Sequence, residues 1–197
     1  MTDWDARYAE GGWLFGTEPN DHLREQAHWI PPGRVLCLAE GQGRNAAWLA
    51  ERGYDVTATD ISDVGLESAR RLAAAKGVRL ATVHADLADF AIEAGAWQGI
   101  VSIFAHVPPE TRRRVHAAVV SGLAPGGVFI LEAYRPEQLG RGTGGPPEDD
   151  RMMNLERLRD EVAGLEWLVA RELDRDVLEG HRHCGRGSVV QLVARHA

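Results

Sequence analysis

Short, nearly uninterrupted apolar runs alternate along the chain with segments of helical spacing. Residues 35–38 and 97–104 are such runs, and continuous apolar character is typical of parallel strands that are buried on both faces. Between them, apolar residues recur at helical intervals in residues 45–52 and 64–76. The pattern predicts an α/β fold in which strands and helices alternate around one mostly parallel sheet.

The same pattern predicts the remaining elements. Further strands are expected at residues 54–60, 80–84, 128–134, 167–177 and 188–195. A helix capped by Asn20 or Asp21 should run to Trp29, a second should open at Pro109, and a third should span residues 154–162. With 197 residues, we expect one domain over residues 1–197. Residues 1–20 would be its N-terminal arm, and residues 135–150 an irregular loop rich in glycine and proline.

The first strand leads into a glycine turn, Glu40-Gly41-Gln42-Gly43-Arg44-Asn45-Ala46. Gly41 and Gly43 have no Cβ atoms, so a ligand can approach the backbone. The turn formally fits a dinucleotide fingerprint, but it also suits S-adenosylmethionine, or a turn that only packs a helix on a strand. Glu40 favours S-adenosylmethionine, because its carboxylate would repel a pyrophosphate and attract an ammonium or sulfonium.

Two further acids follow the next strands. Asp60 ends the second strand, where it could accept hydrogen bonds from both ribose hydroxyls or, like Ser62, cap the following helix. We favour the ribose because position and spacing agree with the glycine turn. Asp86 follows the third strand, where it could accept from the adenine amine while Leu87 packs on the ring. Spacing alone does not separate that role from an ordinary loop cap.

Charge and composition favour a small-molecule substrate. The net charge of −7 argues against a general affinity for nucleic acid, and we interpret Arg112-Arg113-Arg114 as a solvated helix face. His181, His183 and Cys184 are too closely spaced for a zinc site, so no metal is predicted. The chain has no apolar segment long enough for a bilayer and no signal-like N-terminus, so we expect a cytoplasmic protein without a membrane partner.

The N-terminal arm is rich in aromatic and glycine residues. Trp13 and Phe15 provide apolar surface to bury, and Gly11, Gly12 and Gly16 permit hinge motion. Two interpretations are open: the aromatic rings cover an edge of the core, or the arm is a lid that closes over a cofactor and substrate.

Taken together, these motifs resemble small bacterial class I S-adenosylmethionine-dependent methyltransferases, and within that superfamily the tellurite-resistance and thiopurine type. The resemblance covers nearly the whole chain and rests on the glycine turn, Asp60, residues 104–109, Pro125-Gly126-Gly127 and the Phe15 to Asn20 segment. It implies one doubly wound, mostly parallel seven-stranded sheet with an antiparallel last strand, a Rossmann-like fold. It also implies S-adenosylmethionine as the cofactor.

The resemblance assigns roles to individual residues. Around the cofactor it places Phe15, Gly16, Asn20, Glu40, Gly41, Gly43, Asn45, Asp60, Ile61, Asp86, Leu87 and Phe104. The glycines would approach the methionine portion, Asp60 the ribose, Asp86 and Leu87 the adenine, and residues 104–106 the sulfonium. The chain departs from the superfamily at three positions: Cys37 stands where Asp is common, and Ala39-Glu40 replaces a common Gly-Cys pair.

The expected activity is methyl transfer to a small molecule, with a thiol, a thiopurine or a selenium or tellurium oxyanion as candidate acceptors. Displacement at an activated methyl group depends mainly on alignment, so no catalytic base is obligatory. An oxygen or nitrogen acceptor would benefit from His106, His181 or His183, and Arg182 could steer an oxyanion. An NAD-dependent oxidoreductase and a non-catalytic S-adenosylmethionine-binding module are the alternatives. The protein would act as a monomer or homodimer.

Overall fold

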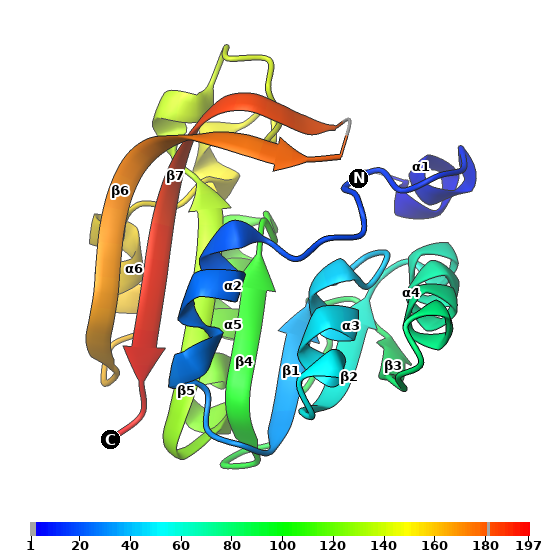
Figure 1. Cartoon of the computed structure of the whole chain (residues 1–197). Helices are drawn as coiled ribbons and strands as arrows, with labels where there is room; N and C mark the ends of the chain where they lie inside the picture. Colours follow the sequence, from blue (N-terminus) through cyan, green and yellow to red (C-terminus); the bar gives the residue numbers. More distant parts are fainter. Residues whose placement is uncertain (1–2, 181) are drawn as a thin grey trace.

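A seven-stranded sheet forms the centre of the protein (Figure 1). The structure is a computed structural model and describes residues 3–180 and 182–197. The strand order is β3-β2-β1-β4-β5-β7-β6, in which β1 to β5 pair in parallel and β7 is antiparallel to both of its neighbours. The strands are β1 Arg34–Leu38, β2 Asp55–Asp60, β3 Ala81–His84, β4 Trp97–Ile103, β5 Leu123–Tyr134, β6 Glu166–Glu179 and β7 His183–Arg195. The predicted fold class is confirmed.

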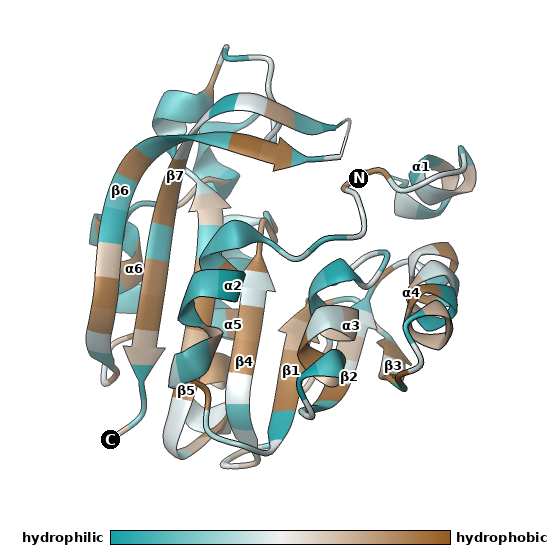
Figure 2. Cartoon of the chain, in the orientation of Figure 1, coloured by the Kyte–Doolittle hydropathy of each residue, from teal (hydrophilic) through white to brown (hydrophobic). Residues whose placement is uncertain are grey.

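Helices cover both faces of the sheet, because successive residues of each buried strand point to opposite sides. From β1, Val35 and Cys37 pack with α2 and α3, whereas Leu36 and Leu38 pack in the cluster that includes α5 and α6. Figure 2 shows hydrophobic residues gathered on the strands. The helices are α1 Trp4–Ala9, α2 Asp21–Gln26, α3 Arg44–Glu51, α4 Asp63–Ala75, α5 Pro109–Gly122 and α6 Leu155–Glu161, with short 3-10 turns at Ala27–Trp29, Pro136–Gln138 and Asp149–Arg151.

The helices begin where cap residues predict. The Asn20 side chain accepts from the Leu23 N–H at the start of α2, and Pro109 is the first residue of α5. Ser62 caps α4 by accepting from the Gly65 N–H, which leaves the Asp60 carboxylate for other contacts. None of the helices in the described part of the chain is both long and apolar enough to cross a membrane.

One basic residue predicted to be solvated is buried instead. Arg112 is 4% exposed; its Nε lies 2.9 Å and 3.0 Å from the carboxylate oxygens of Glu161, and it also donates to the Asp150 carbonyl. Consecutive helical residues point about 100° apart, so a triplet of arginines cannot share one face. Arg112 faces α6, and Arg113 and Arg114 are exposed.

The β6–β7 hairpin is longer than predicted and curls over the carboxyl ends of the parallel strands toward the N-terminal arm (Figure 1). In open α/β sheets this edge binds ligands where the strand order reverses, here between β1 and β4. Each of these strands is followed directly by a non-glycine residue in the left-handed region, Ala39 at φ 48° and Phe104 at φ 54°. Such strained backbone is uncommon and gathers at functional sites.

The two glycines of the turn after β1 are required by the packing of the protein itself. Gly41 and Gly43 have φ values of 61° and 89°. A Cβ added at Gly43 would lie 2.5 Å from the Ala69 Cβ on α4, and one added at Gly41 would lie 2.3 Å from the Tyr8 hydroxyl. A glycine here therefore does not by itself indicate a ligand.

Replacing Gly43 with alanine is expected to lower the free energy of unfolding by about 2–5 kcal/mol, because a strained φ and a forced contact both contribute. Gly53 is the matched control: its φ is 88°, yet a Cβ there meets nothing within 4 Å. Gly53→Ala should lose only the backbone part, about 1–2 kcal/mol. Urea denaturation followed by circular dichroism measures both. Equal losses would mean that the Ala69 contact costs nothing.

Candidate functional site

Glu40 closes the N-terminus of α3. Its Oε1 accepts hydrogen bonds from the N–H groups of Asn45 and Ala46, both at 2.9 Å. Burial raises the pKa of Glu40 to about 7, although these donors and Arg44 oppose the shift. A helix N-terminus after a glycine turn is where a pyrophosphate would bind. A carboxylate of the protein already occupies that position, so the turn suits a cofactor without phosphate groups.

Asp60 ties the end of β2 to the glycine turn. Its Oδ2 accepts from the Gly41 N–H at 2.8 Å and its Oδ1 from the Ser62 N–H at 2.9 Å. Burial raises the pKa of Asp60 against the effect of these donors. A carboxylate has about four lone-pair sites, so each oxygen can still accept a hydroxyl hydrogen bond. Beside it, Ile61 is a large hydrophobic side chain with 38% of its surface exposed.

The predicted adenine residues occupy different environments. Asp86 accepts from the Ala88 N–H through Oδ1, which is the local loop role that spacing left open. Leu87 is buried in the core cluster that includes Val115 and Val119 of α5. Ile61 is therefore the more accessible apolar surface at this edge.

The N-terminal arm is attached to the turn and to α4. Gln42 accepts from the Leu14 N–H and donates to the Gly12 carbonyl, both at 2.9 Å. The Asp5 carboxylate accepts from the Ser62 hydroxyl at the start of α4. These contacts lay Tyr8 over Gly41. No sequence pattern singles out Gln42, because the residue between the two glycines of such a turn can be of any type.

Asn20 is committed to contacts within the protein. Its Nδ2 donates to Glu132 at 2.7 Å and to Glu179 at 2.8 Å, while its Oδ1 caps α2. The Asn20 N–H donates to Asn45 Oδ1. Both side-chain polar atoms therefore have protein partners, and Asn20 acts here as a link between the arm, α3 and the sheet.

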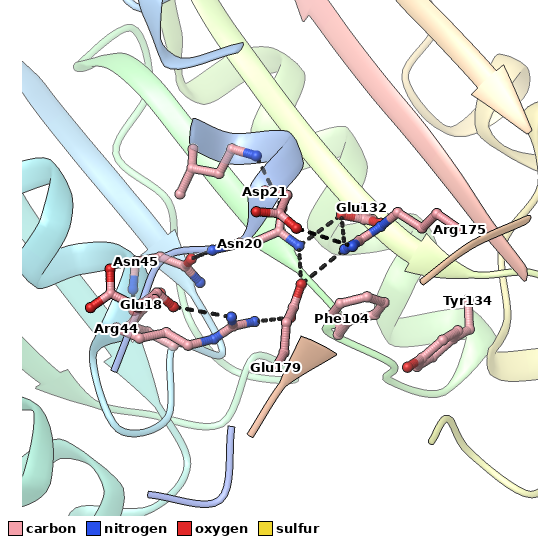
Figure 3. Close-up of polar contacts among 12 residues, drawn as sticks. Glu18, Asn20, Asp21, Arg44, Asn45, Phe104, Glu132, Tyr134, Arg175 and Glu179 are labelled. Atoms are coloured by element: carbon pink, nitrogen blue, oxygen red, sulfur yellow. Dashed lines mark hydrogen bonds and ion pairs between the residues drawn. The ribbon is translucent and has the colours of Figure 1, made fainter. Parts of the chain in front are cut away.

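Two arginines complete this buried network (Figure 3). Arg175 binds Glu132 through Nε at 2.6 Å and Glu179 through a terminal nitrogen at 2.9 Å. Arg44 pairs with Glu179 from the other side. Burial raises the pKa of Glu132; in Glu179 burial acts in the same direction, but the two guanidinium groups hold its pKa below the usual range. Glu132 could have been noticed in the sequence as the one charge in the most apolar strand.

Aromatic rings gather beside the network at the ends of β4, β5 and the hairpin. The His183 ring lies 4.6 Å from Phe15, 4.8 Å from Phe104 and 5.4 Å from Tyr134, measured between centroids. Gly16 adjoins Gly180 of the hairpin. Three predicted site residues, Phe15, Phe104 and His183, thus come together in one cluster.

The predicted catalytic residues differ in what they can do. His106 accepts from the Tyr134 N–H through Nε2, so Nδ1 carries the proton and donates to the Phe104 carbonyl. Burial lowers the pKa of His106 to about 4, and both ring nitrogens are bonded to backbone. His183 is also neutral near pH 7, because burial lowers its pKa to about 3. Its buried Nδ1 has no hydrogen-bond partner among the described residues.

The other hairpin residues predicted for the site are Arg182 and His181. Arg182 is exposed and pairs with Glu10 at 3.0 Å. His181 lies outside the described residues. Within residues 3–180 and 182–197, no three His, Cys, Asp or Glu side chains are grouped so that they could hold a metal ion.

Comparison with known proteins agrees with this geometry. Residues 35–127 match the model of a methyltransferase domain. A 2-heptyl-1-hydroxyquinolin-4(1H)-one methyltransferase of Mycobacteroides abscessus is 27% identical over 125 residues, 62% of this chain and 55% of that protein. A demethylmenaquinone methyltransferase of Thermus thermophilus is 30% identical over 111 residues, 55% of this chain and 50% of that protein. The chain thus spans about half the length of these curated relatives.

Solved structures extend the likeness to the whole fold. TehB from Haemophilus influenzae superposes with a TM-score of 0.75 at 19% identity, covering 98% of this chain and 67% of that one. A structure that concerns the conversion of a disulfide bond into a thioacetal group during echinomycin biosynthesis has a TM-score of 0.76 at 20% identity, covering 98% and 90%. Residues 35–127 therefore match a methyltransferase domain, and the resemblance to class I S-adenosylmethionine-dependent methyltransferases that the motifs predicted is confirmed.

Proposed function

We propose that this protein transfers a methyl group from S-adenosylmethionine to a small-molecule acceptor. The observation that carries the proposal is the Glu40 carboxylate at the N-terminus of α3. It takes the place that a dinucleotide pyrophosphate needs. Burial raises the pKa of Glu40 to about 7, and a bound ammonium or sulfonium would lower that pKa again and pair with the ionised carboxylate.

The residues at the strand ends fit this cofactor. Asp60 has lone pairs left for the ribose hydroxyls, and the exposed side chain of Ile61 offers an apolar surface to the adenine. The acids Glu40, Asp60 and Asp86 match a cofactor that donates hydrogen bonds from hydroxyl and amine groups. When bound, S-adenosylmethionine supplies an activated methyl group.

The aromatic cluster is the proposed acceptor side. Phe15, Phe104 and Tyr134 would exclude water and align the acceptor against the cofactor. The Nδ1 of the neutral His183 ring has no hydrogen-bond partner among the described residues, so it can accept a hydrogen bond from an acceptor S–H or O–H group. A bound anion beside it would be needed to raise its lowered pKa and make it a stronger base. His106 would hold Phe104 and Tyr134 in place rather than act as a base.

Thiols, thiopurines and selenium or tellurium oxyanions are the candidate acceptors. The Mycobacteroides abscessus relative is named for a hydroxyquinolinone, so flat heteroaromatic hydroxyl compounds join them. An oxyanion would pair with the Arg182 guanidinium group. A soft sulfur, selenium or tellurium nucleophile needs little deprotonation and so depends less on a base.

A cofactor titration and an acceptor panel test the proposal. S-adenosylhomocysteine at about 100 times its Kd should stabilise the native state by about 2.7 kcal/mol and raise the melting temperature, while NAD should leave it unchanged. Turnover of at least one acceptor, measured as homocysteine released by a coupling hydrolase, is the expected result. A shift with NAD alone would favour an oxidoreductase. Cofactor binding without turnover of any acceptor would favour a non-catalytic binding module.

Replacing His183 with alanine should lower turnover at least tenfold, about 1.4 kcal/mol of activation barrier, because the ring faces the proposed acceptor. Affinity for S-adenosylhomocysteine should change little. His28→Ala is the control, since His28 is exposed and bonded only to the nearby Glu25 carbonyl. Steady-state kinetics and calorimetry measure the two quantities. Wild-type turnover in His183→Ala would remove His183 from the mechanism.

A further inference from the structure

The buried side chains of the network around Glu179 carry no net charge. The two buried carboxylates, Glu132 and Glu179, are matched by the two guanidinium groups of Arg44 and Arg175. Asp21 lies 3.6 Å from Arg175 at the edge of the network, where its half-exposed carboxylate is solvated. The Glu132 side chain is fully buried and that of Glu179 is 5% exposed. Charges so far from water are poorly screened, so losing one of them would leave an unbalanced charge that acts over several ångströms.

Glu179 connects the turn after β1 with the β6–β7 hairpin. Its carboxylate pairs with Arg44, the residue directly after Gly43 of the glycine turn. It also precedes Gly180, where an added Cβ would meet the backbone of Leu14 at 2.4 Å. The arm and the hairpin are therefore in contact immediately beside the Glu179 carboxylate.

The negative charge of Glu179 is felt on the acceptor side as well. Burial is the largest influence on the pKa of Tyr134 and of His183; Glu179 acts to raise both pKa values, and Arg44 and Arg175 act to lower them, so the carboxylate offsets the two guanidinium groups here. In the view of Figure 3, Phe104 lies between Glu179 and Tyr134, and its ring packs on the Tyr134 ring at 4.6 Å between centroids. The Phe104 N–H donates to the Glu132 carbonyl at 2.7 Å, so the residue proposed for the sulfonium side is attached to the same network.

We infer that Glu179 is a positioning residue whose carboxylate offsets the buried charges of Arg44 and Arg175, so that no uncompensated guanidinium group opposes the sulfonium of the cofactor. The inference rests on the proposed function. S-adenosylmethionine and S-adenosylhomocysteine differ by one methyl group and one positive charge, so an unbalanced positive charge in the network would weaken binding of the first more than binding of the second. A neutral network would therefore help fresh cofactor to displace spent cofactor after each turnover.

Glu179→Gln tests this charge while keeping the size and most hydrogen bonds of the side chain. We expect the ratio of the Kd for S-adenosylmethionine to the Kd for S-adenosylhomocysteine to rise about three- to tenfold, from a unit charge acting across a poorly screened distance. Isothermal titration calorimetry at fixed pH and salt measures both constants. Glu166→Gln is the matched control: Glu166 lies on the same strand and also pairs with an arginine, but at the exposed far end. Its ratio should equal that of the wild type.

A charge-restoring variant separates an electrostatic effect from a structural disruption of the site. Combining Glu179→Gln with Arg175→Gln leaves Arg44 opposite Glu132 and a neutral network, so the ratio should return to within about twofold of the wild type. If Glu179→Gln does not fold, Arg175→Gln alone removes a positive charge and should lower the ratio.

The outcomes keep this inference apart from the proposed function. A wild-type protein that binds neither cofactor form would overturn the proposed function. Suppose instead that the wild type binds both forms and that Glu179→Gln has the wild-type ratio of the two Kd values. Glu179 then has only a structural role. If Glu179→Gln does not fold, an unchanged ratio in Arg175→Gln leads to the same conclusion. A shifted ratio that the double variant fails to restore would also overturn the electrostatic account.

Discussion

The pairing of Arg44 with Glu179 holds together two parts of the fold that the sheet alone does not fix. Arg44 begins α3 in the parallel half, and Glu179 ends β6 at the opposite edge of the sheet. Two buried charges are costly to desolvate, and removing one partner typically costs 3–5 kcal/mol because the other remains. The Arg44–Glu179 pair therefore stabilises the arrangement in which the hairpin, the arm and the turn after β1 meet. Asn20 and Arg175 satisfy the lone pairs that this ion pair leaves open.

Local sequence patterns were enough to predict much of the fold. Buried strands such as residues 35–38, the cap at Asn20 and the first-turn Pro109 are decided by a few neighbouring residues, so the sequence predicts them well. The Asp60 carboxylate also lies beside the glycine turn, as expected from strand order. Burial of Arg112 could not be predicted, because it depends on Glu161 of another helix.

The site was harder to predict because its contacts are distant in sequence. Asn20 bonds to residues 112 and 159 positions away, and no local signal marks such partners. A similar limit applies to the glycine turn. The motif is typical of ligand approach, yet Ala69 and Tyr8 already use the space that Gly43 and Gly41 leave free. Internal packing is therefore enough to require this glycine pattern, whether or not a ligand approaches the turn.

The imidazole of His106 has a mechanical consequence. The Tyr134 N–H and the Phe104 carbonyl lie on neighbouring strand ends, and the ring is inserted between them as acceptor and donor. It acts as a spacer that continues the ladder while holding β4 and β5 apart beyond Ile103 and Glu132. Since burial lowers the His106 pKa from 6.5 to about 4, this spacer contributes stability above pH 6.5 that is lost as the pH falls toward 4. A ring protonated at Nε2 would place its N–H donor against the Tyr134 N–H donor. Acidification should therefore separate the ends of β4 and β5, beside the aromatic cluster, before other parts of the sheet.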